Sequence, residues 1–371
     1  MTNNELKEHL TDAIGLLNIP GIGRGRYRKL VSVFGSPSAV LAAPVSQLTE
    51  LGGFSSALAN EIKQSFDSKK ARETAARVIQ LGWAVLFHRE TGYPQVLERL
   101  HDSPQLLFRV GKAIEPEEKI IAIVGTRHPT EKGRGFAFHL ASSLARAGVT
   151  VISGMAEGID SAAHLGALEA GGKTVAVWGN ALDVLYPTSN RELAERIKTQ
   201  GAIYSEYLPG TKPDRAFFPE RNRIISGLSE GVVVVEAGKK SGALITAARA
   251  LEHGRELFAV PGSPDARMSK GTNELIKKGA RLTTSADDIF AELPALKGKV
   301  LARRFLQMPE MTEGENNIVK LLSSGAMQID QLSRETDLPI EELMELLLAL
   351  ELKGVLSEIS GKRFTLSEGY L

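Results

Sequence analysis

Cysteine is absent from this 371-residue sequence, which excludes disulfides, thiolate metal sites and a cysteine nucleophile. Apolar runs of about 18 residues are absent too, and the first residues, MTNNELKEHL, are polar and charged. We therefore expect a cytoplasmic protein with no export signal, no membrane span and no membrane partner. An excess of one charge is also missing, because the net charge is +1. Any nucleic-acid site must then come from local clusters of basic residues.

Several enzyme motifs are missing as well. No Gly-x-Gly-x-x-Gly follows the first predicted strand, and no Gly-x-Ser-x-Gly occurs. Residues 171–174, Gly-Gly-Lys-Thr, fail as a phosphate loop because Ala167 replaces the required glycine. The seven histidines show no metal-ligand spacing. We predict no cofactor, no metal and no catalytic residue; the best enzymatic alternative is an acid/base pair of Glu206 and Glu236, which follow predicted strands.

The length of the chain exceeds one ordinary core and predicts several domains. Changes of pattern along the chain divide it into four parts: a SAM-like or helix-hairpin-helix domain at 1–75, an extended Rossmann-like domain at 76–292, a linker at 293–313, and a winged-helix-like domain at 314–371.

Two glycine-containing turns, at 19–23 and 51–54, join short helices in the first domain. The first turn is followed by four basic residues, Arg24, Arg26, Arg28 and Lys29. Such a turn either presents free N–H groups to a phosphate or merely permits a tight connection between packed helices.

Six short runs rich in Val and Ile alternate with Ala-rich helical stretches from residue 119 onward. They are residues 120–124, 149–152, 174–177, 202–205, 232–235 and 257–260. This alternation is typical of βα units and predicts an α/β fold with an open, mainly parallel, Rossmann-like sheet. Ligands of such sheets bind outside the carboxyl ends of the strands, so the residues that follow each run form the predicted site.

Small and basic residues follow several of these runs. Glycines and backbone amides at a helix start, with a basic side chain beside them, bind anions. The residues predicted to contact a phosphate backbone are Gly125, Thr126, Arg127, Ser153, Gly154, Gly158, Gly179, Asn180, Arg221, Asn222, Arg223, Lys239, Lys240, Ser241 and Gly242. Either one of the two arginines in 221–223 binds while the other braces the fold, or both are structural. Asp160 is expected to be a helix N-cap.

The last domain shows three predicted helices, at 316–322, 329–335 and 340–353, and a two-stranded wing at 355–359 and 363–366. The third helix of a DNA-reading winged helix enters the major groove. Here it carries four acidic residues against Lys353: Glu341, Glu342, Glu345 and Glu351. Because these charges repel phosphate, we expect a protein contact or a structural role for this domain.

Together, certain strings resemble the bacterial DNA-processing protein A family, also called Smf. They are Gly125-Thr126-Arg127, Ser153-Gly154, Gly158-Ile159-Asp160, Tyr186-Pro187, Ser205-Glu206, Phe218-Pro219 with Arg221-Asn222-Arg223, Ser241-Gly242, Thr246-Ala247 and Pro261-Gly262. The resemblance implies single-stranded-DNA binding, protection of incoming strands in natural transformation, loading of the RecA recombinase, a homodimer formed through the Rossmann-like domain, and no catalysis. It assigns the family's phosphate-contacting arginine to Arg127. Glu157 and Thr188 depart from the family and remove possible phosphate contacts.

Two other functions stay open. One is a nucleotide-processing, phosphoribohydrolase-like enzyme with Glu206 or Glu236 as acid/base, although the Gly-Gly-x-Gly-Thr string of such enzymes is absent. The other is an interaction protein whose terminal domains are docking surfaces.

Overall fold

The computed structural model describes residues 2–296, 311–323, 325–359 and 363–366. Most of the predicted linker, the turn of the predicted wing and residues 367–371 lie outside these ranges. The chain forms two compact units, Met1–Leu296 and Lys297–Leu371, and each is described by itself. The four-part division of the chain stays a prediction.

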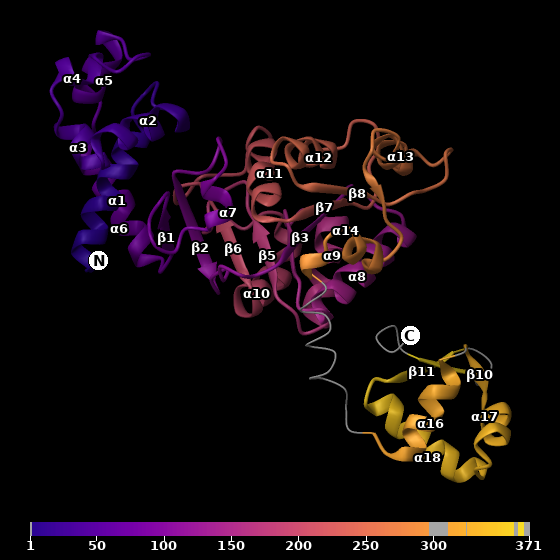
Figure 1. Cartoon of the computed structure of the whole chain (residues 1–371). Helices are drawn as coiled ribbons and strands as arrows, with labels where there is room; N and C mark the ends of the chain where they lie inside the picture. The colour runs from indigo at the N-terminus through magenta and orange to yellow at the C-terminus, as the bar shows by residue number, and fades with distance from the viewer. Residues whose placement is uncertain (1, 297–310, 324, 360–362, 367–371) are drawn as a thin grey trace. The chain divides into compact units, whose positions relative to one another are not determined.

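Short helices form the N-terminal region of the first unit (Figure 1). They are α1 (Asn3–Leu17), α2 (Arg24–Phe34), α3 (Pro37–Ala42), α4 (Val45–Thr49), α5 (Ser56–Gln64) and α6 (Ser68–Gln80). A capping box of Thr2 and Glu5 begins α1. Gly21, with a φ of 82°, turns the chain between α1 and α2, and Gly35, with a φ of 86°, ends α2. Glycine adopts this left-handed backbone without strain, so the local sequence sets these boundaries.

A nine-stranded sheet is the centre of the first unit. Its strands are β1 (Ala84–Phe87), β2 (Leu106–Gly111), β3 (Ile120–Val124), β4 (Thr150–Ser153), β5 (Thr174–Val177), β6 (Ala202–Ser205), β7 (Gly231–Val234), β8 (Glu256–Ala259) and β9 (Arg281–Leu282), in the order β1-β2-β6-β5-β4-β3-β7-β8-β9. Only β1–β2 and β2–β6 pair antiparallel. The six runs predicted from the sequence form β3 to β8, each within one residue, and the predicted α/β fold is confirmed.

Helices lie on both faces of the sheet (Figure 1). They are α7 (Gln95–Glu98), α8 (Glu131–Arg146), α9 (Ile159–Glu169), α10 (Arg191–Gln200), α11 (Phe217–Leu228), α12 (Ala243–Glu252), α13 (Lys270–Lys277) and α14 (Ala286–Glu292), with 3-10 turns η1 (Thr188–Asn190), η2 (Arg267–Ser269) and η3 (Pro294–Leu296). β3, β4 and β5 are buried along their whole length. Two covered faces explain why these strands read as continuous apolar runs.

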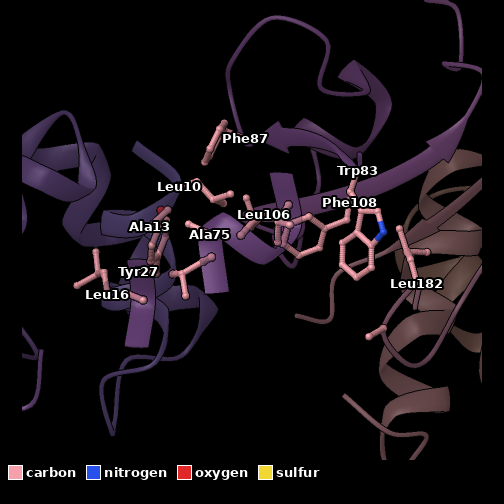
Figure 2. Packing of buried hydrophobic residues seen from close by; sticks show 14 of the residues in the cluster. Leu10, Ala13, Leu16, Tyr27, Ala75, Trp83, Phe87, Leu106, Phe108 and Leu182 are labelled. Atoms are coloured by element: carbon pink, nitrogen blue, oxygen red, sulfur yellow. The ribbon is translucent and has the colours of Figure 1, made fainter. Parts of the chain in front are cut away.

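One apolar cluster continues from the N-terminal helices into the sheet (Figure 2). Leu10 of α1 and Tyr27 of α2 are buried in the same cluster as Trp83 and Phe108. The rings of Trp83 and Phe108 lie 5.5 Å apart between centroids, tilted by 57°. Each such buried side chain contributes about 1.5–3 kcal/mol. This shared core fixes the N-terminal helices against β1 and β2.

The second unit is a small winged helix. It consists of α16 (Glu313–Leu322), β10 (Met327–Gln328), α17 (Ile329–Thr336), α18 (Ile340–Leu352), β11 (Leu356–Ile359) and β12 (Arg363–Leu366). The strands pair antiparallel in the order β10-β12-β11. The unit has a core of its own, made by buried residues that include Ile318, Leu332, Leu343, Leu347 and Phe364.

Candidate nucleic-acid interface

The winding of the sheet changes direction at β3. This strand pairs with β4 on one side and with β7 on the other. The loops that follow β3 and β7 therefore diverge and leave a crevice, which is where open α/β sheets bind ligands. A cavity of about 880 Å³ occupies the crevice. It is lined by residues 124–128 after β3, by 238–243 after β7 and by part of α11.

Arg127 is exposed at the edge of this cavity. Its guanidinium carbon lies 5.2 Å from the centre of the Phe218 ring. On the same ring, Tyr186 packs at 5.7 Å between centroids, tilted by 33°, and its side chain is 39% exposed. A cation–π contact holds the guanidinium in place, while no described residue accepts a hydrogen bond from it. The N–H groups of Arg127 are thus available to an external anion, next to two aromatic rings.

Glu236 fixes the loop that carries Arg127. Its carboxylate accepts hydrogen bonds from the Thr130 backbone N–H at 2.9 Å and from the Thr130 hydroxyl at 2.6 Å. Its carbonyl oxygen accepts from the Thr126 N–H at 2.8 Å. Thr130 in turn caps α8 by accepting from the Gly133 N–H at 3.0 Å. Glu236 therefore positions both ends of the segment 126–130.

Four further cations line the cavity and are exposed: Lys239, Lys240, Arg267 and Lys270. In the described part of the chain no acceptor bonds to them. The loop that carries the two lysines faces open space, because a Cβ on Gly242 would meet nothing within 4 Å. Ser241 closes this loop by accepting from the Ala243 N–H at 3.3 Å, where α12 begins. The cavity is thus a positively charged crevice that attracts anions.

Arg221 lies in the interior beside the cavity, with 4% exposure. It donates to the Gly154 carbonyl at 2.6 Å and to the Val177 carbonyl. Burial lowers the pKa of Arg221 to about 10, against the opposing effect of Asp160. Burial also raises the pKa of Asp160, although the charge of Arg221 and hydrogen bonds such as that from the Gly154 N–H at 3.1 Å lower it. A Cβ on Gly154 would lie 2.7 Å from the guanidinium, so this glycine makes room for Arg221.

Gly158, and not Asp160, is the N-cap of α9, so the predicted capping role of Asp160 is wrong. Gly158 has a φ of 87°, and a Cβ there would lie 2.5 Å from the Thr126 carbonyl oxygen. The Ile159 N–H donates to that oxygen at 3.2 Å. Glycine is needed here because α9 begins directly against the loop of Arg127. The space beside Gly158 is filled by the protein's own backbone.

Arg223 is 3% exposed and pairs with Glu206 at 2.5 Å. The second carboxylate oxygen of Glu206 lies 2.8 Å from Arg24, which also contacts Glu220 at 2.8 Å. Glu206 is therefore neutralised by one arginine of α11 and one of α2. A partly buried carboxylate shared by two arginines acts as a fixed structural link.

The other basic residues after the first N-terminal turn also have partners inside the chain. Arg26 donates to the Gly21 carbonyl at 2.7 Å. Arg28 donates to the His101 carbonyl, and Lys29 donates to the Gly52 carbonyl. All four cations that follow the glycine turn are thus bonded within the protein.

The predicted contact residues fall into three groups. Those lining the main cavity are Gly125, Thr126, Arg127, Arg221, Asn222, Lys239, Lys240, Ser241 and Gly242. An adjoining smaller hollow, which shares Arg127, Ala156, Phe218 and Arg221 with the cavity, is lined by Gly154, Gly179 and Asn180. The structure brings Ser153, Gly158 and Arg223 into neither. The hydroxyl of Ser153 donates to the Ile123 carbonyl at 2.6 Å, and the amide of Asn180 donates to the Ala181 carbonyl at 3.0 Å.

Sequence reasoning did not select several lining residues, namely Phe218, Tyr186, His128, Arg267 and Lys270. Two of these had a visible signal. Tyr186 and Phe218 each precede a proline in the strings that carried the family resemblance. Arg267 and Lys270 carried no such signal, because they follow β8 and reach the cavity only through the fold.

The structure gives both acid/base candidates other partners. Glu206 is held by two arginines and Glu236 by Thr130. A serine, a histidine and an aspartate do align elsewhere: Ser226 lies 2.9 Å from His253, and His253 lies 3.3 Å from Asp102. However, Ser226 is completely buried and its hydroxyl also faces two carbonyls of α11. This alignment therefore has no access to a substrate.

Within the described ranges, no group of three or more His, Cys, Asp or Glu side chains could hold a metal ion. No helix in that part of the chain is long and apolar enough to cross a membrane.

Comparison with known proteins identifies the family of the chain. The family model for DNA recombination-mediator protein A matches residues 84–294. The chain belongs to this DNA-processing protein A family, also called Smf. Models of the DprA winged helix domain and of a SAM-like helix-hairpin-helix tandem match residues 307–362 and 13–67. The family resemblance seen in the sequence is confirmed.

Curated relatives and solved structures cover most of the chain. DNA processing protein DprA of Bacillus subtilis is 42% identical over 260 residues, which are 70% of this chain and 87% of the relative. The X-ray structure of DprA from Streptococcus pneumoniae matches with a TM-score of 0.67 and 33% identity, covering 79% of this chain and 98% of that one. A DprA structure from Helicobacter pylori, described for its single-stranded DNA binding mode, matches with a TM-score of 0.51 and 31% identity, covering 57% and 95%.

Proposed function

We propose that this chain binds single-stranded DNA without sequence preference, through phosphates held in the crevice after β3 and β7. One observation carries the proposal. Arg127, fixed over Phe218 but with its N–H groups free of described acceptors, lines the same cavity as the open loop of Lys239 and Lys240. A backbone phosphate fits the cations, and a base fits the aromatic rings beside them. The Helicobacter pylori relative, a single-stranded-DNA binder by its description, supports this function.

The contact residues divide into those that touch the strand and those that position them. We propose that the exposed cations Arg127, Lys239 and Lys240 bind phosphates, with Gly125, Thr126, Asn222, Ser241 and Gly242 close to the backbone. The buried members of the predicted set have their polar groups committed inside the protein and act by positioning: Ser153, Asn180, Arg221 and Arg223. Gly154, Gly158 and Gly179 permit the close packing around them.

We also propose a wider role, which extends the description of the family. In this proposal the protein is a non-enzymatic, cytoplasmic recombination mediator that forms a homodimer, protects incoming strands during natural transformation and loads the RecA recombinase. Support comes from the family model, whose description is a recombination mediator. Stimulation of RecA filament assembly on single strands covered by a single-strand-binding protein would test the loading step, and sedimentation would test the dimer.

A titration of labelled oligo-dT at two salt concentrations tests the binding proposal. We expect tight binding at low salt and a steep loss at high salt, because phosphate contacts release counterions. Arg127→Ala should weaken binding by about tenfold or more, the worth of a charge-assisted hydrogen bond. Glu157 lies beside the crevice and should limit the affinity. No binding at low salt would refute the proposal, and normal binding by Arg127→Ala would refute the choice of anchor.

A further inference from the structure

A row of exposed apolar side chains runs along α18, the third helix of the winged helix. Its members are Ile340, Met344, Leu348 and Leu352, with exposures of 51%, 47%, 57% and 82%. They are spaced by four residues, so they lie on one continuous face of the helix. We call this row the α18 stripe.

The α18 stripe is separate from the core of the domain. Leu343, Leu347 and Leu350 of the same helix are buried in that core, so the helix already has an apolar face that packs inward. Four of the ten large apolar side chains exposed in the described residues lie on this one helix. Single exposed apolar residues are common, but a contiguous row of them marks an interaction surface.

The charged residues of α18 itself all have one sign. Glu341 and Glu345 follow its first two members, and Glu351 precedes the last. The one basic residue at the end of the helix, Lys353, bonds to the Glu315 carboxylate at 2.6 and 2.7 Å. Residues 311–371 contain eleven acidic and five basic side chains. The face therefore combines an apolar surface with a negative rim.

These charges indicate which kind of molecule can bind the α18 stripe. Duplex DNA is disfavoured, because glutamates at the position of a recognition helix would meet phosphates. A second copy of the same face is disfavoured as well, because glutamate would meet glutamate across the contact, and like charges facing each other are costly. A peptide segment with apolar side chains and flanking lysines or arginines can cover the α18 stripe with its apolar side chains and pair its cations with the surrounding glutamates.

We propose that the α18 stripe docks a basic amphipathic helix of a partner protein. Apolar residues of that helix cover Met344 and Leu348, and its basic residues face Glu341 and Glu345. This surface is independent of the crevice after β3 and β7, so the two proposals fail or stand separately.

The test uses the full chain and a fluorescent synthetic helix with leucines every fourth residue and lysines beside them. The same peptide with glutamates in place of lysines is the matched probe. We expect the lysine peptide to bind and the glutamate peptide to bind at least about tenfold more weakly. Leu348→Ser should weaken the binding of the lysine peptide by about tenfold. Leu251→Ser, at a leucine of α12 that is 63% exposed, should leave its Kd unchanged.

The charge requirement has its own control. Glu345→Lys should weaken binding of the lysine peptide, while Glu358→Lys, at an exposed site on β11 of the same unit, should change it far less. Failure of the lysine peptide to bind would overturn the proposal, as would equal binding by the Leu348 and Leu251 variants. Self-association that disappears in Leu348→Ser would also overturn the proposal, because a second copy of the chain would then be the partner. Displacement of the peptide by duplex DNA would overturn it too, because DNA would then bind this surface.

Discussion

Two regions of the first unit look alike in the sequence and differ in the structure. The N-terminal turn at 19–23 and the loops after β3 and β7 all place glycines before basic residues. In the N-terminal turn every such cation bonds to an acceptor of the chain, as Arg24 does with Glu206 and Glu220. In the loops, Arg127, Lys239 and Lys240 face a cavity with no described acceptor. A basic cluster becomes an anion site only where the fold leaves its cations without an acceptor inside the chain.

The acceptors that the chain itself supplies explain the difference. Asp160 is the single acidic residue among the described residues that line the cavity, and its charge is offset by Arg221. Around α2, by contrast, Glu206 and Glu220 lie within ion-pair distance of Arg24, and backbone carbonyls accept hydrogen bonds from Arg26, Arg28 and Lys29. Arg24 and Arg28 therefore attach α2 to residues beyond the N-terminal helices, while the cations of the loops remain available to phosphate.

The largest effect is expected for Arg221, a buried cation that donates hydrogen bonds within the protein. Arg221→Ala should lower the free energy of unfolding by about 3–5 kcal/mol, because it leaves the buried Gly154 and Val177 carbonyls without their donor and removes the charge that offsets buried Asp160. Arg127→Ala removes an exposed side chain and should change the same free energy by less than about 0.5 kcal/mol. Urea denaturation at neutral pH measures both. Equal losses in the two variants would remove the distinction between a bracing and a binding arginine.

The next effect concerns DNA affinity. Reversing both loop charges, in Lys239→Glu with Lys240→Glu, should weaken oligo-dT binding by about a hundredfold, because attraction is replaced by repulsion at two phosphates. The matched control is Arg26→Glu with Lys29→Glu, which makes the same charge change at two exposed residues beside the N-terminal turn. If the control loses as much affinity as the loop variant, the contrast between the regions is wrong.

A smaller effect is expected at the link between α2 and α11. Arg24→Ala should destabilise the protein by about 1–2 kcal/mol, since Arg24 is partly exposed and Glu206 keeps Arg223. DNA affinity should stay unchanged, because Arg24 does not line the cavity. Thermal melting and oligo-dT titration of the same preparation separate the two outcomes. A loss of affinity without a loss of stability would place Arg24 in the DNA site.

The smallest effect is a dependence of stability on pH. Burial tends to raise the pKa of Asp102, but the hydrogen bond from His253 and the charge of Arg223 prevail and lower it to about 2. A carboxyl with a lowered pKa stabilises the fold at neutral pH, and this contribution disappears as the pH falls from about 4 towards 2. Because Asp102 is only half-buried, we expect about 1 kcal/mol.

Asp102→Asn should therefore destabilise the protein at pH 7 and approach the wild type near pH 2. Asp265→Asn, at an exposed loop position, is the control. A constant difference between Asp102→Asn and the wild type across this range would contradict the assignment to ionisation.

Local sequence predicted much of the fold. Runs of Val and Ile matched β3 to β8 within one residue, because strands buried on both faces have a continuous apolar sequence. The position of Arg127 after β3 also followed from the sequence, because strand ends form the crevice of an open sheet. β1 and β2 were less visible, since they join the edge of the sheet by antiparallel pairing.

Long-range partners could not be predicted. Glu236 meets Thr130 across 106 residues, and Arg24 meets Glu206 across 182. No local sequence pattern shows that Arg221 is buried while Arg127 is exposed. Nor does one show that Arg24 is paired while Lys239 is free of described partners. The charge of a side chain can be read from the sequence, but its neighbours are set by the fold.

The most direct test of the central claim is the salt dependence of single-strand binding. For each cation that no longer neutralises a phosphate, the slope of log K against log salt should become shallower by about 0.7. We predict that replacing Arg127, Lys239 and Lys240 together by alanine makes this slope shallower by about 2, whereas replacing Arg26 and Lys29 leaves it unchanged. An unchanged slope in the triple variant, or an equal change in the N-terminal one, would contradict the claim.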